Sequence, residues 1–168
     1  AALKRKAEEE ALRTSSYFQE VLDNLPFGVL VLDKALDAVY WNSHVEHLFG
    51  LSDGLMRKGL SIKTVIRRLA EEGCYGPGRL DELVENRFAR LSMFQAHSVE
   101  LTRPGGSTLL VRGSPVMIGA TPSGFILLQE DITERKQDEY LARQQEMEKS
   151  LTTLRAAVSN INQGISMF

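Results

Sequence analysis

The residue types that could perform chemistry are few and scattered in this chain of 168 residues. Cys74 is the only cysteine, so an internal disulfide and a cysteine-rich metal site are excluded. Its neighbours Glu71 and Glu72 disfavour a reactive thiolate, and Cys74 is interpreted as a loop thiol or a small apolar core residue. Metal-ligand clusters, phosphate-binding loops and Ser-His-Asp arrangements are absent as motifs. The sequence therefore predicts a protein that is not an enzyme.

Three histidines and one arginine remain as candidates for binding. His44 and His47 fall in a short helix that is predicted to be capped by Asn42–Ser43 and to end at Phe49–Gly50, and His97 falls in a predicted strand. A surface or packing role accounts for all three histidines. Arg112, in a later predicted strand, is the best candidate for contacting an anion, while a salt bridge or an exposed position is its simpler interpretation.

Composition and charge exclude several classes of protein. Hydrophobic residues make up 43% and charged residues 25% of the chain, as in soluble globular proteins. The net charge of −2, with acids and bases interspersed, gives no support for a nucleic-acid partner or a basic membrane surface. No apolar run reaches the roughly 20 residues of a membrane span, and no signal peptide opens the chain. A single thiol suits a reducing, cytoplasmic location, and the missing initiator Met suits a piece of a larger protein.

The elements that must position these residues begin with helical sequence. The first residues are strong helix formers, and residues 1–16 are predicted to be a linker helix. Residues 14–16, followed by Gln19 in capping-box spacing, predict the start of a second helix that stops at Pro26.

Five strands and a helical middle region follow. The strands are predicted at residues 28–33, 38–41, 97–103, 108–118 and 124–131. Residues 51–94 have helical spacing with interruptions. Gly113 and Pro115 predict that the fourth strand is bent and near an edge, and residues 119–124 are predicted to be a loop. The last strand is apolar on both faces, which favours a central position in the sheet.

A long helix is predicted over residues 134–162. Its apolar residues are spaced alternately four and three apart, which is a heptad seam with one polar position, Gln144. The seam consists of Tyr140, Gln144, Met147, Leu151, Leu154, Val158, Ile161 and Ile165. A solitary helix would leave this stripe in water, so we expect a parallel homodimer with the seam from Met147 to Ile161 as its contact. Folding back onto its own domain is the alternative.

Several short motifs stand out along the chain. They are Leu25-Pro26-x-Gly28-Val-Leu-Val-Leu-Asp33, Val39-Tyr40-Trp41-Asn42, Gly50, Arg103-Pro104-Gly105-Gly106-Ser107 and the closing Asp131-Ile132-Thr133-Glu134-Arg135-Lys136. Together with the order of two strands, a helical stretch and three strands, these motifs resemble the PAS family. The resemblance implies an α+β PAS fold over residues 17–133, with a five-stranded antiparallel sheet, helices on one side, and N- and C-terminal linker helices.

The resemblance also implies a function. It indicates a sensory and dimerisation module of a bacterial signalling protein, in which Asp131, Ile132 and Thr133 couple the sheet to the output helix. The simpler interpretation of Asp131 and Thr133 is a helix N-cap. The effector is expected in the same parent chain and is most often a histidine kinase of a two-component system, because Tyr75-Gly76-Pro77-Gly78 resembles a subgroup frequent there. A diguanylate cyclase or phosphodiesterase is the next choice, and a passive dimerisation scaffold is the rival function.

PAS domains often hold a cofactor between the sheet and the helices, and two cofactors can be tested against the residues. Haem would need an axial histidine in the helix at 80–94, which has none. A flavin-binding domain of the LOV type would place its reactive cysteine in Asn-Cys-Arg-Phe-Leu-Gln, whereas Cys74 lies in Gly-Cys-Tyr-Gly-Pro-Gly. We therefore expect neither cofactor.

The sequence leaves open whether the domain binds an unidentified small ligand. Its pocket would be lined by Val84, Phe88 and Leu91, with Arg112 as the anion contact. The alternative is that these side chains fill the core themselves.

The end of the chain resembles the start of its own domain. Residues 158–168 align without gaps to residues 22–32, with an asparagine and a glycine identical. Residues 163–168 are therefore predicted to begin a second PAS domain with its first strand, and a helix end of similar sequence is the alternative.

Overall fold

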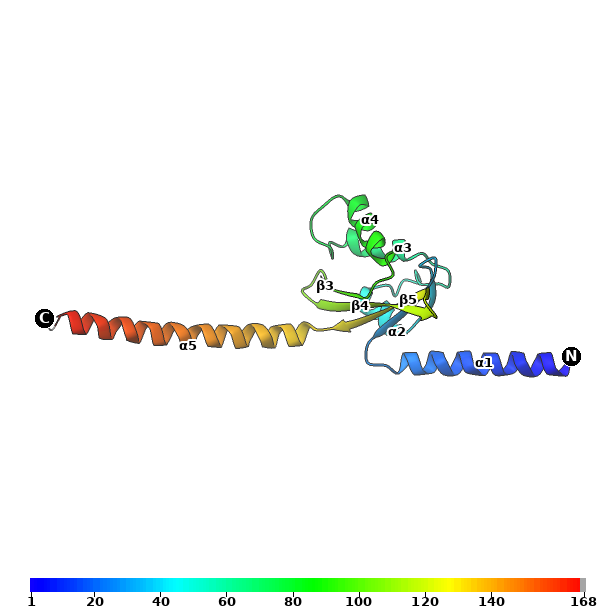
Figure 1. Ribbon diagram of the computed structural model, residues 1–168, viewed down its shortest axis with the longest axis horizontal. Coiled ribbons are helices and arrows are strands. Elements are labelled where there is room, and N and C mark those ends of the chain that lie inside the picture. Colours follow the sequence, from blue (N-terminus) through cyan, green and yellow to red (C-terminus); the bar gives the residue numbers. More distant parts are fainter. Residues whose placement is uncertain (167–168) are drawn as a thin grey trace. The chain divides into compact units, whose positions relative to one another are not determined.

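The centre of the structure is a five-stranded antiparallel sheet with the order β2-β1-β5-β4-β3 (Figure 1). Its strands are β1 (Gly28–Asp33), β2 (Ala38–Trp41), β3 (His97–Thr102), β4 (Thr108–Ile118) and β5 (Thr121–Asp131). The computed structural model describes residues 1–166, with the side chains of residues 1–161. The predicted sheet is confirmed, and the last strand lies at its centre.

Three helices cover one face of the sheet, which we call the helical face. They are α2 (Ser43–Phe49), α3 (Ile62–Glu71) and α4 (Leu80–Leu91), and Figure 1 shows α3 and α4 together on that side. The side chain of Asn42 accepts a hydrogen bond from the Val45 amide at the start of α2, and Gly50 ends the helix in the left-handed conformation. The predicted start and end of α2 are therefore confirmed.

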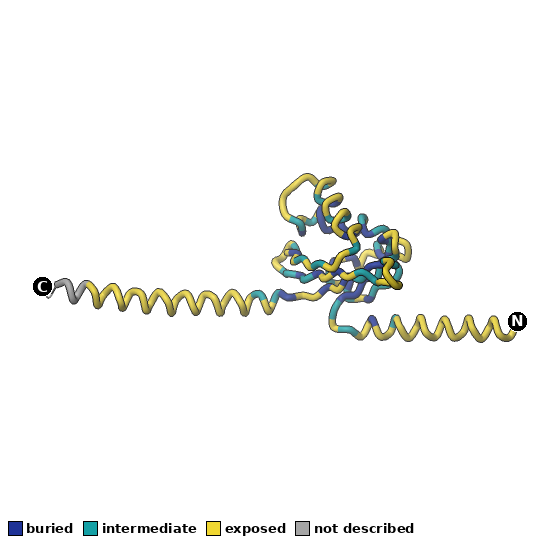
Figure 2. The backbone as a smooth tube through the Cα atoms, in the orientation of Figure 1, coloured by how far each residue is buried: buried dark blue, intermediate teal, exposed yellow. Residues whose placement is uncertain are grey.

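The hydrophobic core lies between the helical face and these three helices. The amphipathic helix α3 supplies Val65, Ile66 and Leu69 at helical spacing. Alternate strand residues point inward, and Phe125 on β5 is fully buried. Figure 2 shows buried residues gathered in the sheet and its covering helices, with exposed residues along α5 and most of α1.

The opposite face of the sheet, the outer face, is only partly covered. The last turns of α1 contact it, because the rings of Phe18 and Tyr40 meet edge to face with centroids 5.3 Å apart. Gln19 Nε2 also donates a hydrogen bond to the Trp41 carbonyl oxygen at 2.9 Å. Leu128 on the central strand keeps 37% of its surface exposed.

The N-terminal helix α1 (Ala2–Asp23) is continuous, which corrects the break predicted at residues 14–16. Thr14 Oγ1 donates to the Glu10 carbonyl oxygen at 2.9 Å, so this hydroxyl is used inside the helix and not as a cap. Strong helix formers before this segment carry the helix through it. The helix ends at Asn24, shortly before Pro26.

The predicted loop at residues 119–124 is too long, because β4 and β5 form one long hairpin and only residues 119–120 lie in its turn. Gly119 takes a positive φ of 64° in that turn. β3 pairs with β4 only as far as Gly113, so beyond it β4 has one neighbour. Pro115 lies in this edge segment, and the register shifts just after Val116. The predicted edge position is confirmed at Pro115, and the predicted irregularity of the strand lies just after Val116.

The C-terminal helix α5 (Thr133–Ser166) belongs to a second compact unit, which begins directly after Ile132. The backbone is helical at residues 163–166, where the start of a strand was predicted. Residues 167–168 lie outside the described residues, so the second PAS domain stays a prediction. Within the described part of the chain, no helix combines the length and the apolar character that crossing a membrane requires.

Candidate functional site

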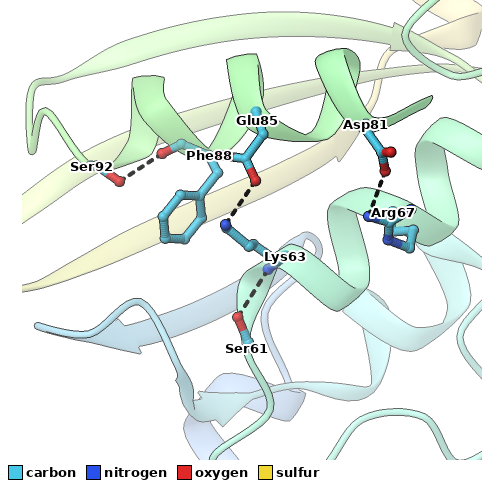
Figure 3. Close-up of polar contacts among 7 residues, drawn as sticks. All are labelled: Ser61, Lys63, Arg67, Asp81, Glu85, Phe88 and Ser92. Carbon is cyan, nitrogen blue, oxygen red and sulfur yellow. Dashed lines mark hydrogen bonds and ion pairs between the residues drawn. The ribbon is translucent and has the colours of Figure 1, made fainter. Parts of the chain in front are cut away.

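Two ion pairs join α3 to α4 over the helical face (Figure 3). Lys63 Nζ lies 2.9 Å from Glu85 Oε1, and Arg67 Nη2 lies 3.1 Å from Asp81 Oδ1. The Lys63 ammonium also lies 4.4 Å from the centroid of the Phe88 ring. The charged groups are largely exposed, so each ion pair contributes at most about 1 kcal/mol. Their role is to hold α3 and α4 side by side above the sheet.

A cavity of about 40 Å³ lies between this helix pair and the helical face. Apolar side chains from strands and helices make up most of its wall, among them Leu30, Ile66, Leu69, Leu91, Val111 and Leu127. A space of this size holds roughly three water molecules. It therefore suits only a small ligand, or the small apolar part of a larger one.

Three polar side chains interrupt the apolar wall: Tyr75, Arg87 and His97. The Arg87 guanidinium lies over the Tyr75 ring, 5.0 Å from its centroid. The His97 ring stacks on Phe125 with centroids 5.7 Å apart, and its Nδ1 donates to the Gln95 carbonyl oxygen at 3.1 Å. The cavity thus offers a guanidinium, a phenol and an imidazole in an otherwise apolar setting.

The Tyr75 phenol is held in its neutral form. Burial raises its pKa to about 12, and the Arg87 guanidinium offsets part of that rise. We expect an ultraviolet titration of the folded chain to show one tyrosine ionising near pH 12, and Tyr75→Phe to remove that step. The folded pKa exceeds the unfolded value of about 10, so the resulting stabilisation is complete below about pH 10 and is lost as the pH rises to about 12. Tyr17→Phe should leave the late step in place, and joint ionisation of all tyrosines would contradict the prediction.

A second recess of about 440 Å³, which we call the outer groove, opens beside the cavity. It lies between the loop after α3, the helix α4 and the strand β3. Tyr75, Arg87 and Leu101 line both the outer groove and the cavity. These three side chains therefore form the partition between the two spaces.

Cys74 lines the outer groove and not the cavity. The residue is 6% exposed and belongs to the hydrophobic core cluster. Burial raises the pKa of its thiol, so the thiol stays protonated at neutral pH. The structure thus favours the interpretation of Cys74 as a small core residue.

Arg103 connects the turn after β3 to the helices. Its Nη1 donates to the Leu48 carbonyl oxygen at 2.6 Å, and its Nη2 lies 2.8 Å from Glu72 Oε2. Gly50 leaves room for this guanidinium, since an added Cβ would lie 2.9 Å from Arg103 Nη2. The ion pair is mostly shielded from solvent, so it positions the ends of α2 and α3 beside the sheet.

The structure brings only part of the predicted pocket together. Leu91 lines the cavity, and Val84 is buried in the core. Phe88 is partly exposed beneath Lys63 (Figure 3). Arg112 is a correction: it is exposed on the outer face, opposite Leu128 in the sheet, and lines a different recess. Side chains alternate along a strand, and because the neighbouring Val111 faces the cavity, Arg112 points away from it.

Arg87 is the cation that sequence reasoning missed. It lies three residues after Val84 and four before Leu91, so it shares their face of α4. The signal that could have identified Arg87 is its charge at a helix position where the spacing otherwise places apolar residues. His97 had a similar signal. Residues two apart on a strand share a face, so His97 lies on the same face of β3 as Leu101.

Neither haem nor flavin fits the residues present. The cavity of about 40 Å³ cannot hold either ring system, α4 has no histidine, and Cys74 lies outside the cavity wall. Among the side chains of residues 1–161, no group of three or more His, Cys, Asp or Glu could hold a metal ion. The cavity therefore suits a ligand that places only a few heavy atoms inside it.

Asn42 forms a buried junction between α1, β1 and α2. Its Nδ2 donates to the carbonyl oxygens of Leu22 and Phe27 at 2.7 and 2.9 Å. Its Oδ1 accepts from the amides of Val29 and Val45 at 3.0 and 3.4 Å. The side chain is fully buried, so the end of α1 is tied to the edge of the sheet through one residue.

The predicted coupling residues lie where the central strand β5 meets the C-terminal helix. Asp131 ends β5, the buried Ile132 donates its amide to the Thr108 carbonyl oxygen at 2.9 Å, and Thr133 begins α5. Leu127 on the same strand lines the cavity. A single central strand therefore leads from the cavity wall to the start of the C-terminal helix.

The predicted dimer seam is an exposed stripe on α5. Between 45 and 64% of the surface of each residue is exposed, and the residues are Met147, Leu151, Leu154, Val158 and Ile161. These exposed apolar side chains recur along a helix whose other residues are mostly polar or small.

Comparisons with known proteins agree with this geometry. A family model described as PAS fold matches residues 22–140. The PAS domain of BvgS from Bordetella pertussis is 17% identical with a TM-score of 0.55, over 82% of this chain and 98% of that one. The PAS domain of an HTR-like protein from Haloarcula marismortui is 20% identical with a TM-score of 0.50, over 76% of this chain and 99% of that one.

One further match is to part of a longer protein. The sensor region of a sensor histidine kinase is 23% identical with a TM-score of 0.49, over 65% of this chain, and this chain spans about 40% of that region. Curated proteins give no significant match. At these identities the solved structures show the fold alone.

Proposed function

The chain belongs to the PAS family, and from that premise we propose that it is a sensory and dimerisation module of a bacterial signalling protein. It relays the state of a small ligand through α5 to an effector in the same parent chain. The module has no catalytic role of its own. A histidine kinase is the proposed effector, on the sequence resemblance of residues 75–78 to that subgroup. The single, buried and protonated Cys74 suits a reducing, cytoplasmic setting.

The continuity of β5 supports this proposal most directly. Leu127 lines the cavity, and the same strand ends at Asp131 before α5 begins. A ligand that binds two arrangements of the cavity wall with different affinity would shift the position or register of this strand. The strand end would pass that shift to Ile132 and Thr133.

The exposed seam of α5 supports dimerisation. Parallel pairing of two chains would bury the stripe from Met147 to Ile161, which water otherwise contacts. A small rotation of the paired helices could then be read by an effector. Gln144 is the one polar seam position, and it would influence the register of the pair.

A passive dimerisation scaffold is the second candidate, and the small size of the cavity favours it. Native mass spectrometry of the purified chain separates the two functions. A dimer that retains the extra mass of a ligand supports the sensory function. A dimer without extra mass supports the passive scaffold.

The coupling residues provide the test of the proposed function. In the parent protein, replacing Asp131 and Thr133 together by alanine should abolish the response to the stimulus and leave the basal output. The reason is that the link between β5 and α5 changes while the core does not. Thr152→Ala is the matched control, since Thr152 is exposed on α5 and bonds only within that helix. An unchanged response in the double variant would refute the relay.

A further inference from the structure

Arg87 occupies the partition between an apolar cavity and an open groove. Among the described residues, the ion pairs of α4 use Asp81, Glu82 and Glu85, and none of them involves Arg87. Its guanidinium instead lies over the Tyr75 ring. A guanidinium with a planar fork of donors is the group that best recognises a carboxylate.

The two sides of this partition differ in polarity. The cavity side is lined mostly by aliphatic residues such as Leu69, Leu91 and Val111. The groove side includes Asn86, Glu100 and Thr102, which are exposed. A ligand that crosses the partition therefore needs an apolar end in the cavity and a polar end at the groove.

The polar end is best placed at the partition itself. Glu100 lines the outer groove but not the cavity, so an anion farther out would meet a carboxylate. At the partition, Arg87 offers a positive charge and the neutral Tyr75 phenol offers a hydroxyl donor. A ligand with one carboxylate at the partition is therefore favoured. A second carboxylate would be disfavoured both in the apolar cavity and beside Glu100 in the outer groove.

Resting on the sensory function proposed above, we propose that the ligand of this module is a short aliphatic monocarboxylate. Its carboxylate binds Arg87 at the partition, and its alkyl chain fills the cavity. The cavity of about 40 Å³ has room for roughly three or four carbon atoms beyond the carboxylate. Affinity should therefore rise about fourfold per methylene along a series from propanoate and level off when the cavity is full.

Calorimetric titration of the full chain tests the proposal with pentanoate, pentan-1-ol and pentylamine. These probes have the same number of carbon atoms and differ in the head group. Pentanoate is expected to bind at least about tenfold more tightly than pentan-1-ol, because a charged hydrogen bond at Arg87 is worth about that factor. Pentylamine is expected to bind most weakly. Equal affinity for the acid and the alcohol, or no detectable binding of pentanoate, would overturn the proposal.

Substitutions on α4 identify the residue responsible. Arg87→Gln should lower pentanoate affinity to that of pentan-1-ol and leave pentan-1-ol affinity unchanged, while Arg87→Lys should retain an intermediate preference. Arg90→Gln removes a charge from an exposed site on the same helix and should change neither affinity. If R87Q keeps the preference for the acid, Arg87 is not the contact. If R87Q fails to fold, the comparison of probes on the unaltered chain still decides the ligand class.

Failure of this proposal is distinguishable from failure of the proposed function. Binding of pentan-1-ol without any preference for the acid would leave a sensor of neutral ligands and remove only the carboxylate. Loss of signalling in the variant of Asp131 and Thr133, without binding of any probe, would likewise retain the relay and reject this ligand class.

Discussion

Replacing Asn42 by alanine is expected to lower the free energy of unfolding by about 3 kcal/mol, because a fully buried amide loses four hydrogen bonds. The Val29 amide would be left buried beside an apolar methyl group. The N-cap of α2 is lost as well, which alone costs about 1 kcal/mol. The melting temperature of the chain should fall by about 10 °C.

Two further variants separate the causes of this loss. Ser43→Ala removes an exposed hydroxyl at the next position and should change the free energy of unfolding by less than about 0.5 kcal/mol. Asn42→Asp keeps the acceptor for Val29 and Val45 but loses the donors to Leu22 and Phe27. It should therefore remain strongly destabilised at neutral pH. If the melting temperature of Asn42→Ala lies within about 2 °C of that of the unaltered chain, Asn42 does not stabilise the fold as proposed.

Replacing Gly113 by alanine is expected to cost about 2–3 kcal/mol, because its Cβ would enter the aromatic cluster at the end of the cavity. An added Cβ would lie 2.8 Å from Phe125 Cζ and 2.9 Å from His97 Cε1. Phe125 is fully buried against Phe94 and His97, so its ring has little room to move. Urea denaturation of the purified chain measures the loss.

A second substitution tests whether the overlap with the ring is the cause. Phe125→Leu alone should cost about 1–2 kcal/mol by leaving space in the core. Combined with Gly113→Ala, the new methyl group occupies part of that space, so the double variant should be more stable than the sum of the single losses predicts. Ser114→Ala, at the adjacent exposed position, is the control for the strand itself. Strict additivity of the two losses would reject the steric explanation.

Local patterns predicted most of the fold correctly. The apolar spacing of Val65, Ile66 and Leu69 identified α3, and the uninterrupted apolar run of β5 identified the central strand. Both patterns reflect how much of each element is buried, which a few consecutive residues reveal. The caps at Asn42 and Gly50 were equally legible, because capping uses side chains and backbone within one turn.

The errors arose where local signals compete or where pairing is long-range. Residues 14–16 could cap a helix, but α1 continues through them, and the Thr14 hydroxyl bonds to a carbonyl oxygen inside that helix. Residues 119–124 look like a loop, yet residues 121–124 belong to β5 and pair with β4. In both places the choice depends on neighbours outside the segment.

The sequence alone determined most elements of this protein, their order and their buried stripes, because these follow from the spacing of apolar residues along the chain. Only the tertiary structure decided which charged residue reaches the cavity. Strand alternation turns Arg112 to the outer face, and helix register brings Arg87 to the partition beside Tyr75. It also decided that Asn42 joins three elements rather than capping one. These arrangements join residues that are distant in the chain, and packing of whole elements sets them, so a local pattern can show the face on which a residue lies but not what that face meets.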